Sequence, residues 1–212
     1  MITEKGQSIE DKSFEIIDSE IGRHPYSKDE WPVVRRVIHA TADFDFAGEN
    51  MIIFHKDSIQ SGIKSLKNGR NIVVDVDGVI GGINKENLKK FGNKAICNIS
   101  DPKVASDAKK FNKTRAQTSM RMASLEMNDS IVVIGNAPTA LGEVIQMIKE
   151  RATCPALVIG VPVGFVCAVE SKEELQALQR PYITNKGRKG GSPCASAIVN
   201  ALFKLLKENS SS

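Results

Sequence analysis

The sequence contains few cysteines, and their spacing builds no recognisable site. Four cysteines occur in 212 residues, at positions 97, 154, 167 and 194, with no Cys-x-x-Cys pair and no histidine nearby. This scatter excludes the usual zinc-binding patterns. We therefore expect buried thiols in a reducing compartment and no metal site.

A large excess of charge of either sign is also missing. The chain has 29 basic and 25 acidic residues, a net charge of +4, and no dense basic run with interleaved aromatic residues. These features argue against a nucleic-acid partner, whereas a mildly positive protein is compatible with an anionic small molecule.

Long apolar segments are absent as well. No apolar run approaches the roughly 18 residues of a membrane-spanning helix, and no basic segment followed by an apolar stretch stands at the N-terminus. We expect a soluble cytoplasmic protein with no membrane partner.

The overall composition is that of a globular protein. Hydrophobic residues make up 41% and charged residues 25% of the chain, so a sizeable core can form. The length fits one domain over residues 1–212, with loose ends expected at residues 1–7 and 208–212.

Five short apolar runs alternate with helical patterns. The runs are residues 71–75, 95–99, 131–135, 156–160 and 181–184, and the helical patterns lie at 114–127, 139–151, 171–179 and 193–207. The middle runs are β-branched and almost continuously apolar, which is typical of parallel strands buried on both faces. This order predicts a three-layer α/β/α fold with a flavodoxin-like, five-stranded parallel sheet.

Three further helical patterns precede the first run, at residues 8–21, 28–41 and 57–68. They predict a helical N-terminal arm that packs on the sheet or on a second subunit. Local signals refine two later helices: Ser171 and Glu174 have the spacing of a capping box, and Pro193 suits a first helical turn.

One strand end resembles that of a phosphatase. The stretch from Ile72 to Gly82, IVVDVDGVIGG, has the Asp-x-Asp-Gly pattern with which haloacid-dehalogenase-type enzymes present a nucleophile, Asp75, and an acid/base group, Asp77. That chemistry also needs magnesium and later carboxylates, but the later strand ends read IGNAPTA and IGVPVGF. A helix-capping or ligand-binding aspartate is the favoured interpretation, with phosphate-ester hydrolysis as an alternative.

A second turn, from Gly135 to Gly142, has Ala and Thr where a dinucleotide fingerprint demands glycine. Its backbone amides precede a helix and could still bind a carboxylate or phosphate.

Several motifs together resemble one family. They are SFEII from Ser13, RVIHAT from Arg36 with DFD from Asp43, NKTR from Asn112, IGNAPTAL from Ile134, GVPVGFVCAVESK from Gly160 and GRKGGS from Gly187. These stretches run from about residue 13 to about residue 201 and resemble the precorrin-8X methylmutases of corrin (vitamin B12) biosynthesis, including the cobalt-precorrin form.

The resemblance implies a flavodoxin-like homodimer that moves a methyl group from C-11 to C-12 of a corrin precursor. The product would be hydrogenobyrinic acid, or cobyrinic acid where the substrate carries cobalt, and no cofactor of the protein's own is implied. HATADFDF, from His39, resembles the cobalt-using branch. A corrinoid-binding protein without activity is the alternative.

The resemblance also implies a catalytic residue, His39, whose imidazole would give and retake a proton near neutrality. Arg36 lies one helical turn away, and Asp43 is expected to tune the histidine. Guanidinium groups suit the carboxylates of a tetrapyrrole-derived macrocycle. The expected substrate-binding residues are Ser13, Arg36, Asp75, Arg115, Asn136, Thr139, Gly164 and Arg188.

The sequence departs from the family at Gly78-Val79, where relatives generally have a Met-Val pair. Glycine is unfavourable in a helix, so we expect a looser turn and a changed pocket wall at this point. Elsewhere, His24 and His55 are expected to be structural.

Overall fold

The computed structural model describes residues 3–209, and its centre is a six-stranded sheet. The strand order is β1-β6-β5-β4-β2-β3, in which all neighbours are parallel except β1 and β6. The bounds are β1 (Ile52–Phe54), β2 (Ile72–Val74), β3 (Ala95–Ile96), β4 (Ile131–Ile134), β5 (Leu157–Gly160) and β6 (Tyr182–Asn185). The five predicted runs therefore form the parallel strands in flavodoxin-like order, 2-1-3-4-5.

The sixth strand was missed by the sequence prediction. Ile52–Phe54 pairs antiparallel with β6, so that Ile53 lies opposite Thr184. Three residues are too short for a period to be read, and the preceding helical patterns concealed the strand. β1 therefore covers the outer edge of β6, and it belongs to the segment that links the N-terminal arm to the rest of the sheet.

Side chains alternate between the two faces of the sheet and build two separate cores. Along β2 and β4, Ile72, Val74, Ile131 and Val133 belong to one core, while Val73, Val132 and Ile134 belong to the other. This two-residue period confirms strands that are buried on both faces.

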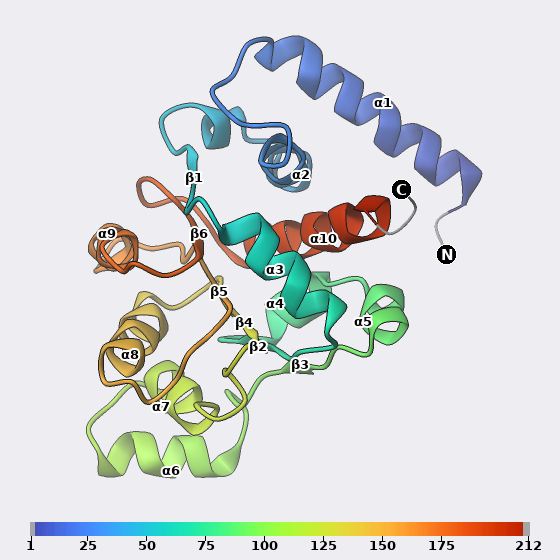
Figure 1. Ribbon diagram of the computed structural model, residues 1–212. Coiled ribbons are helices and arrows are strands. Elements are labelled where there is room, and N and C mark those ends of the chain that lie inside the picture. The colour runs from blue at the N-terminus through green and yellow to red at the C-terminus, as the bar shows by residue number, and fades with distance from the viewer. Residues whose placement is uncertain (1–2, 210–212) are drawn as a thin grey trace.

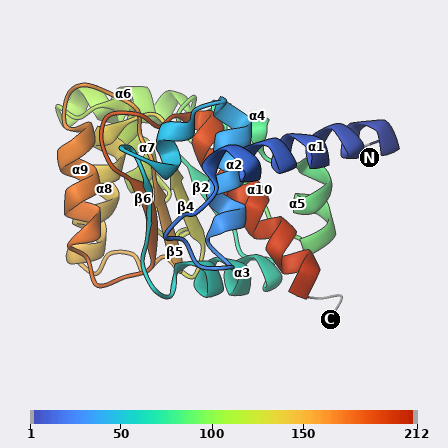
Figure 2. The ribbon, with the colours of Figure 1, turned by 90° about the horizontal axis from the view of Figure 1, so that it is seen from above.

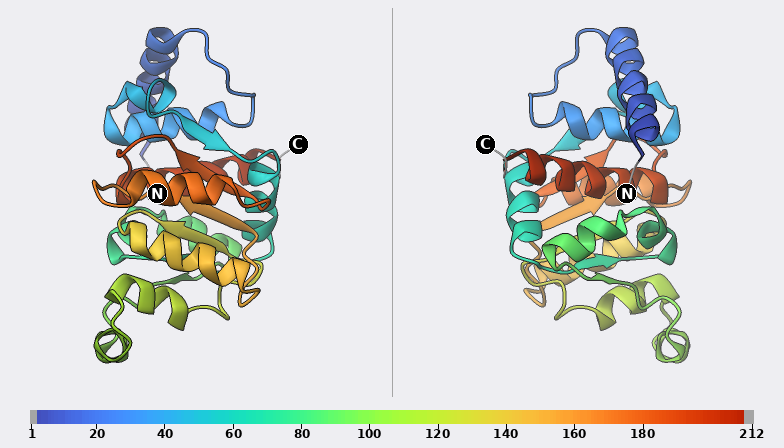
Figure 3. Two further views of the ribbon diagram at one scale, coloured as in Figure 1. Left: turned by 90° about the vertical axis from the view of Figure 1, so that its left-hand side faces the viewer. Right: turned by 90° about the vertical axis from the view of Figure 1, so that its right-hand side faces the viewer.

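Helices cover both faces, as the three-layer prediction requires (Figure 1). α7 (Arg115–Met122), α8 (Pro138–Lys149) and α9 (Ala168–Gln176) lie on one side. On the other side lie α3 (Ser58–Lys67), α4 (Asp77–Gly82), α5 (Lys85–Phe91) and α10 (Ser192–Asn209). α6 (Pro102–Lys110) packs against α7 at the end of the molecule opposite the N-terminal arm (Figure 3).

The N-terminal arm packs on α10 rather than directly on the sheet. It consists of α1 (Glu4–Ile21), α2 (Trp31–Thr41) and the short 3-10 helix η1 (Phe44–Ala47). α2 buries Val33, Val34, Val37 and Ile38, and it makes its most extensive contact with α10. α1 lies outside α2, and its N-terminal end projects beyond the body of the molecule (Figure 2).

Several helix boundaries differ from the predicted ones. α9 begins at Ala168, and Ser171 lies inside it, donating its hydroxyl to the Ala168 carbonyl oxygen at 3.1 Å, so the proposed capping box at Ser171 and Glu174 is wrong. By contrast, Thr114 caps α7 in a capping box with Gln117, and Pro193 occupies the first turn of α10. The ends are more ordered than expected, because residues 4–7 are helical and α10 includes residues 208 and 209. The remaining predicted loose ends, residues 1–2 and 210–212, lie outside the described part.

The cysteine prediction holds only in part. Cys194 is buried and Cys97 is half-buried, but Cys154 and Cys167 are exposed, so they are not buried thiols as expected. All four are free. Among the helices of residues 3–209, none has the length and apolar character needed to cross a membrane.

α4 and α10 approach each other closely because α4 contains glycines. A Cβ atom on Gly82 would lie 2.3 Å from the Ser196 hydroxyl oxygen, and one on Gly78 would lie 3.2 Å from that of Ser192. The expected looser turn at Gly78 is therefore not observed. The residue lies in a helix that its missing side chain allows to pack against α10.

This contact leads to a matched pair of predictions. Gly82→Ala is expected to lower the free energy of unfolding by about 1–3 kcal/mol, because the new methyl group overlaps Ser196. Gly81→Ala, where nothing lies within 4 Å, is expected to raise it by about 0.5–1 kcal/mol through helix propensity. Urea denaturation of both variants measures the difference, and equal effects would contradict the close packing.

Candidate active site

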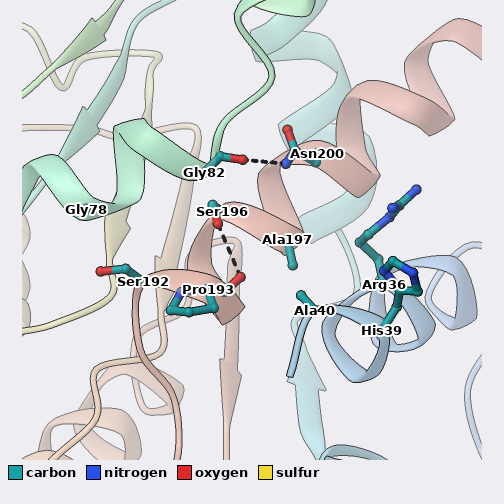
Figure 4. Close-up of a pocket in the computed structure, with 10 residues that line it drawn as sticks. All are labelled: Arg36, His39, Ala40, Gly78, Gly82, Ser192, Pro193, Ser196, Ala197 and Asn200. Atoms are coloured by element: carbon teal, nitrogen blue, oxygen red, sulfur yellow. Dashed lines mark hydrogen bonds between the residues drawn. The ribbon is translucent and has the colours of Figure 1, made fainter. Parts of the chain in front are cut away.

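A pocket of about 330 Å³ opens between α2, α4 and α10. Figure 4 shows α2 on one side of it, presenting Arg36 and His39, and the N-terminal half of α10 on the other. Its lining residues are Arg36, His39, Ala40, Gly78, Gly82, Ser192, Pro193, Ser196, Ala197 and Asn200. Small residues from α4 and α10 therefore face the two large polar side chains of α2.

Asn200 fixes the wall opposite α2. Its side-chain amide donates to the Gly82 carbonyl oxygen at 2.8 Å and accepts from the Asn84 backbone N–H at 2.9 Å. Both bonds satisfy backbone groups at the end of α4. Asn200 thus joins α10 to α4 and holds the small-residue wall in place.

His39 stands in the last turn of α2, where it is exposed to solvent. Its ring packs against Phe14 of α1 with 5.2 Å between ring centroids, and none of the described residues hydrogen-bonds to the imidazole. Partial burial lowers the pKa of His39, Arg36 lowers it further, and Glu10 opposes them. The imidazole is therefore biased toward its neutral form.

Arg36 is balanced by Glu10, a residue that sequence reasoning missed. The guanidinium donates to the Glu10 carboxylate, and this hydrogen bond is the main reason that the pKa of Glu10 is lowered. Phe14 lies beneath the pair, with Arg35, Arg36 and Lys204 at 4.5, 4.8 and 5.2 Å from its ring centroid. One aromatic ring therefore gathers three cations next to His39.

A second hollow continues the pocket along α10. It measures about 390 Å³ and shares Arg36 and Asn200 with the first. Lys204 and Asn87 also line it, so amide and ammonium donors extend away from His39. Glu10 and Glu208 line the second hollow too, so its margin is of mixed charge, and Arg36 and Lys204 are the cations placed to meet the carboxylates of a ligand.

Asp75 lies at the end of β2 and holds the neighbouring turn. Its carboxylate accepts backbone N–H groups from Gly135 at 3.0 Å and from Asn136 and Ala137 at 2.8 Å each. The side chain is fully buried, and burial raises its pKa against the effect of these amides. No oxygen of Asp75 is open to a phosphate ester, so the geometry gives the phosphatase interpretation no accessible nucleophile.

Three other expected site residues lie around the same turn. Asn136 and Thr139 are exposed, and the Thr139 hydroxyl lies 3.1 Å from that of Thr114. Arg115 is also exposed, and it donates to the Ile99 carbonyl oxygen at 2.6 Å. They form a polar group at the carboxyl ends of β3 and β4, outside the His39 pocket.

Gly164 and Arg188 lie together beyond β5 and β6. The Gly164 N–H donates to the Arg188 carbonyl oxygen at 3.2 Å, and the exposed Arg188 guanidinium lies 5.5 Å from the Phe165 ring centroid. The predicted site residues are therefore spread along the carboxyl edge of the sheet. Within the described chain, only Arg36 and His39 among them line the pocket.

Of two expectations at the N-terminal end, the substrate contact of Ser13 stays a prediction and the role of Asp43 needs adjustment. Ser13 lies inside α1 and donates its hydroxyl to the Ile9 carbonyl oxygen at 2.8 Å. Asp43 pairs with Lys189 at 2.7 Å and is not among the groups that shift the pKa of His39. The residues that tune His39 are Glu10 and Arg36. Helical spacing places Glu10 on the same face of α1 as Phe14. It does not show that Glu10 pairs with Arg36 of α2.

The described chain offers no gathering of three histidine, cysteine or acidic side chains suited to a metal ion. A larger hollow of about 580 Å³ lies between α6 and α7, lined partly by Lys113 and Arg121. Both of these cations are paired with the buried Glu143, at 2.9 and 2.5 Å. Their charges are therefore used within the protein.

Comparison with known proteins decides the family. The family model of precorrin-8X methylmutase matches residues 8–205. The chain belongs to the precorrin-8X methylmutase family. It is similar to the cobalt-precorrin-8 methylmutases of Leptospira interrogans (50% identical, covering 96% of each chain) and Priestia megaterium (51% identical, covering 96% of this chain and 90% of the relative). A precorrin-8X methylmutase from a Sinorhizobium species is 34% identical, with 94% of each chain covered.

A solved structure agrees with this family assignment. The precorrin-8X methylmutase of Thermus thermophilus superposes with a TM-score of 0.90 at 39% identity, covering 96% of this chain and 98% of its own. The family prediction from the sequence is confirmed, and with it the prediction of an isomerase. The α/β fold is confirmed too, with one strand more than expected.

The contacts of Asp75 predict a structural role that can be measured. Asp75→Asn is expected to lower the free energy of unfolding by about 2–4 kcal/mol. The side-chain NH2 of asparagine would face backbone N–H groups that now donate hydrogen bonds to the carboxylate. Asp77→Asn, at an exposed position two residues later, is expected to change it by less than about 0.5 kcal/mol. Denaturant titration compares the two, and an equally stable Asp75→Asn variant would contradict the role.

The charges around His39 predict the direction of a pKa change. Glu10 raises the pKa of His39, so Glu10→Gln is expected to lower that pKa further. Arg36→Gln removes a nearby cation and is expected to raise it. NMR titration of the His39 ring protons measures both shifts. Shifts of the same sign in the two variants would refute the opposed influence of Glu10 and Arg36.

Proposed function

We propose that this chain converts cobalt-precorrin-8 into cobyrinic acid by moving a methyl group from C-11 to C-12 of the macrocycle, with His39 as the proton donor and acceptor. The reaction is an isomerisation, so substrate and product have the same atoms. A proton placed on the conjugated ring redistributes its electrons during migration, and its return leaves no net proton transfer.

The observation that carries the proposal is the position of His39 at the pocket. Its imidazole is open to the pocket, is not hydrogen-bonded to any described residue, and lies one turn from Arg36. A general acid must have a ring nitrogen within hydrogen-bond reach of the substrate, and an imidazole that faces the pocket without a described partner leaves one available. Arg36 would meanwhile bind a substrate carboxylate in place of Glu10.

The charges around the pocket support a carboxylated macrocycle as substrate. Lys204 and Asn200 extend the donor surface beyond Arg36, and Arg188 adds a guanidinium at the carboxyl edge of the sheet. The cobalt form is favoured because the relatives at 50% and 51% identity bear that name, whereas the precorrin-8X enzyme from Sinorhizobium is 34% identical. In this proposal any cobalt belongs to the substrate, and the protein supplies no cofactor.

We also propose a homodimer, on the basis of apolar side chains left exposed. Phe165 and Val166 are 85% and 78% exposed, and Ile9 and Ile16 of α1 are 60% and 49% exposed. Adjacent exposed apolar residues are characteristic of surfaces that become covered by a partner. Sedimentation velocity would measure the assembly, and a monomer at micromolar concentration would refute it.

The central test is the variant His39→Asn, assayed with cobalt-precorrin-8 and with its cobalt-free form. We expect the spectral change of rearrangement to slow by about 10²- to 10⁴-fold while corrinoid binding persists. His55→Asn is the matched control, because His55 lies after β1 with its ring nitrogen accepting the Asp57 N–H. Undiminished turnover in His39→Asn would remove the catalytic role. Binding without conversion in the wild type would favour the alternative of a corrinoid-binding protein.

The pH profile gives a further test of the same residue. The pKa of His39 is lowered from its ordinary value of 6.5. The protonated fraction of its imidazole therefore increases mainly at pH values below 6.5. If imidazolium is the proton donor, kcat/KM should rise as the pH falls through this range, and His39→Asn should lack the rise. Steady-state kinetics between pH 5 and 8 measures both, and a wild-type profile identical to that of the variant would exclude the donor role.

A further inference from the structure

Lys172 is an almost completely buried cation without an anionic partner. Its side chain, in α9, is 1% exposed, and no carboxylate of the described residues pairs with it. The ammonium donates instead to the backbone carbonyl oxygens of Gly187 at 3.0 Å and Lys189 at 2.7 Å. Both acceptors belong to residues 186–191, which we call the strap.

The strap turns several of its carbonyl groups inward. Asn185, at the end of β6, donates its side-chain amide to the carbonyl oxygens of Lys186 at 2.7 Å and Lys189 at 3.0 Å. Glycine makes this backbone path possible, since Gly190 has a φ of 151° and a Cβ there would lie 2.2 Å from the Val161 carbonyl oxygen. Lys172 and Asn185 thus provide the donors that hold the inner side of the strap.

The strap connects α9 to both sides of the His39 pocket. From its middle, Lys189 reaches Asp43 and Asp45, at 2.7 and 2.6 Å, in the segment that follows α2. From its end, the chain runs directly into Ser192 and Pro193, which line the pocket. The exposed Arg188 stands directly before Lys189, between the two residues whose carbonyl oxygens accept from Lys172.

An ammonium in this place lowers the stability of the fold. Burial lowers the pKa of Lys172 from 10.5 to about 8, so between these values the unfolded chain binds more protons and stability rises with pH. At neutral pH the buried charge is therefore unfavourable overall. A contribution to stability therefore does not explain why a lysine is buried here, whereas its hydrogen bonds to the strap do.

We propose that Lys172 is a positioning residue, whose ammonium holds the strap so that Arg188 and the Ser192–Pro193 wall keep the geometry that binds the substrate. The inference rests on the proposed function for its kinetic consequence. Its structural part, the hold on the strap, does not depend on the substrate.

The test compares Lys172→Met with Lys149→Met. The first removes the donors while keeping an unbranched apolar side chain. The second removes an exposed lysine that also contacts α9, through Glu174 at 2.6 Å. Trypsin is the structural probe, because the strap contains Lys186, Arg188 and Lys189. Cleavage sites are read by mass spectrometry, and KM and kcat are measured with cobalt-precorrin-8.

We expect Lys172→Met to be cut in the strap about tenfold faster than wild type and to raise KM about tenfold, with a smaller change in kcat. Its melting temperature should be no lower than that of wild type, whereas Lys149→Met should match wild type in cleavage and KM. Unchanged cleavage and KM in a folded Lys172→Met would overturn the proposal. If Lys172→Met is cleaved faster but the wild-type protein converts no corrinoid, the role of Lys172 in holding the strap stands and the proposed function is rejected.

Hydrogen exchange of the wild type decides the matter if Lys172→Met does not fold. The titratable groups that face Lys172 and the strap are Cys194 of α10, whose pKa burial raises to about 12, and Lys189, whose pKa Asp43 and Asp45 raise. None of these titrates near pH 8. Amide protection at residues 188–191, corrected for intrinsic exchange, should change about tenfold between pH 7 and pH 9 as Lys172 loses its charge, falling if the open strap leaves Lys172 buried and rising if opening exposes it to water. Constant protection would overturn the role of the ammonium.

Discussion

The structure depends on the burial of α10 between the sheet and α2. Of its 18 residues, 11 are buried, which is more than contact with a sheet alone requires. Its inner side packs on the sheet and its outer side is covered by α2, so the N-terminal arm is part of the core. A helix enclosed in this way has little polar surface left. The pocket lies where small residues of α10 face α4, between the covering helix and the sheet edge.

The polar groups of the site are then arranged around that enclosed helix. Arg36 and His39 can face the pocket because α2 crosses α10 with its apolar side inward and its polar side toward the opening. Glu10 neutralises Arg36, and in the proposed reaction a substrate carboxylate would exchange with it, replacing one charge-assisted hydrogen bond by another. This exchange also removes the carboxylate that favours protonation of His39, and the incoming substrate carboxylate would take over that influence.

Much of this arrangement could be predicted from local patterns. Apolar runs identified the five parallel strands, and Pro193 correctly marked a helix start, because both signals act within a few residues. The strand β1 was missed because three residues have no readable period. The Ser171–Glu174 signal was misleading because tertiary packing began α9 three residues earlier. Arg36 and His39 could be placed on one helix face. The effect of Glu10 on these two residues depends on how α1 crosses α2. The bonds of Lys172 likewise depend on a long-range backbone path.

The close contact between α2 and α10 has a consequence for the order of synthesis. His39 precedes Ser192, the first α10 residue of its pocket, by 153 residues of sequence. During translation the arm must wait for α10 to emerge before its apolar side is covered. A ribosome-bound fragment therefore has a histidine without a pocket. Synthesis of α10 is what creates the site, and a chain that lacks this helix has no preformed cavity beside the histidine.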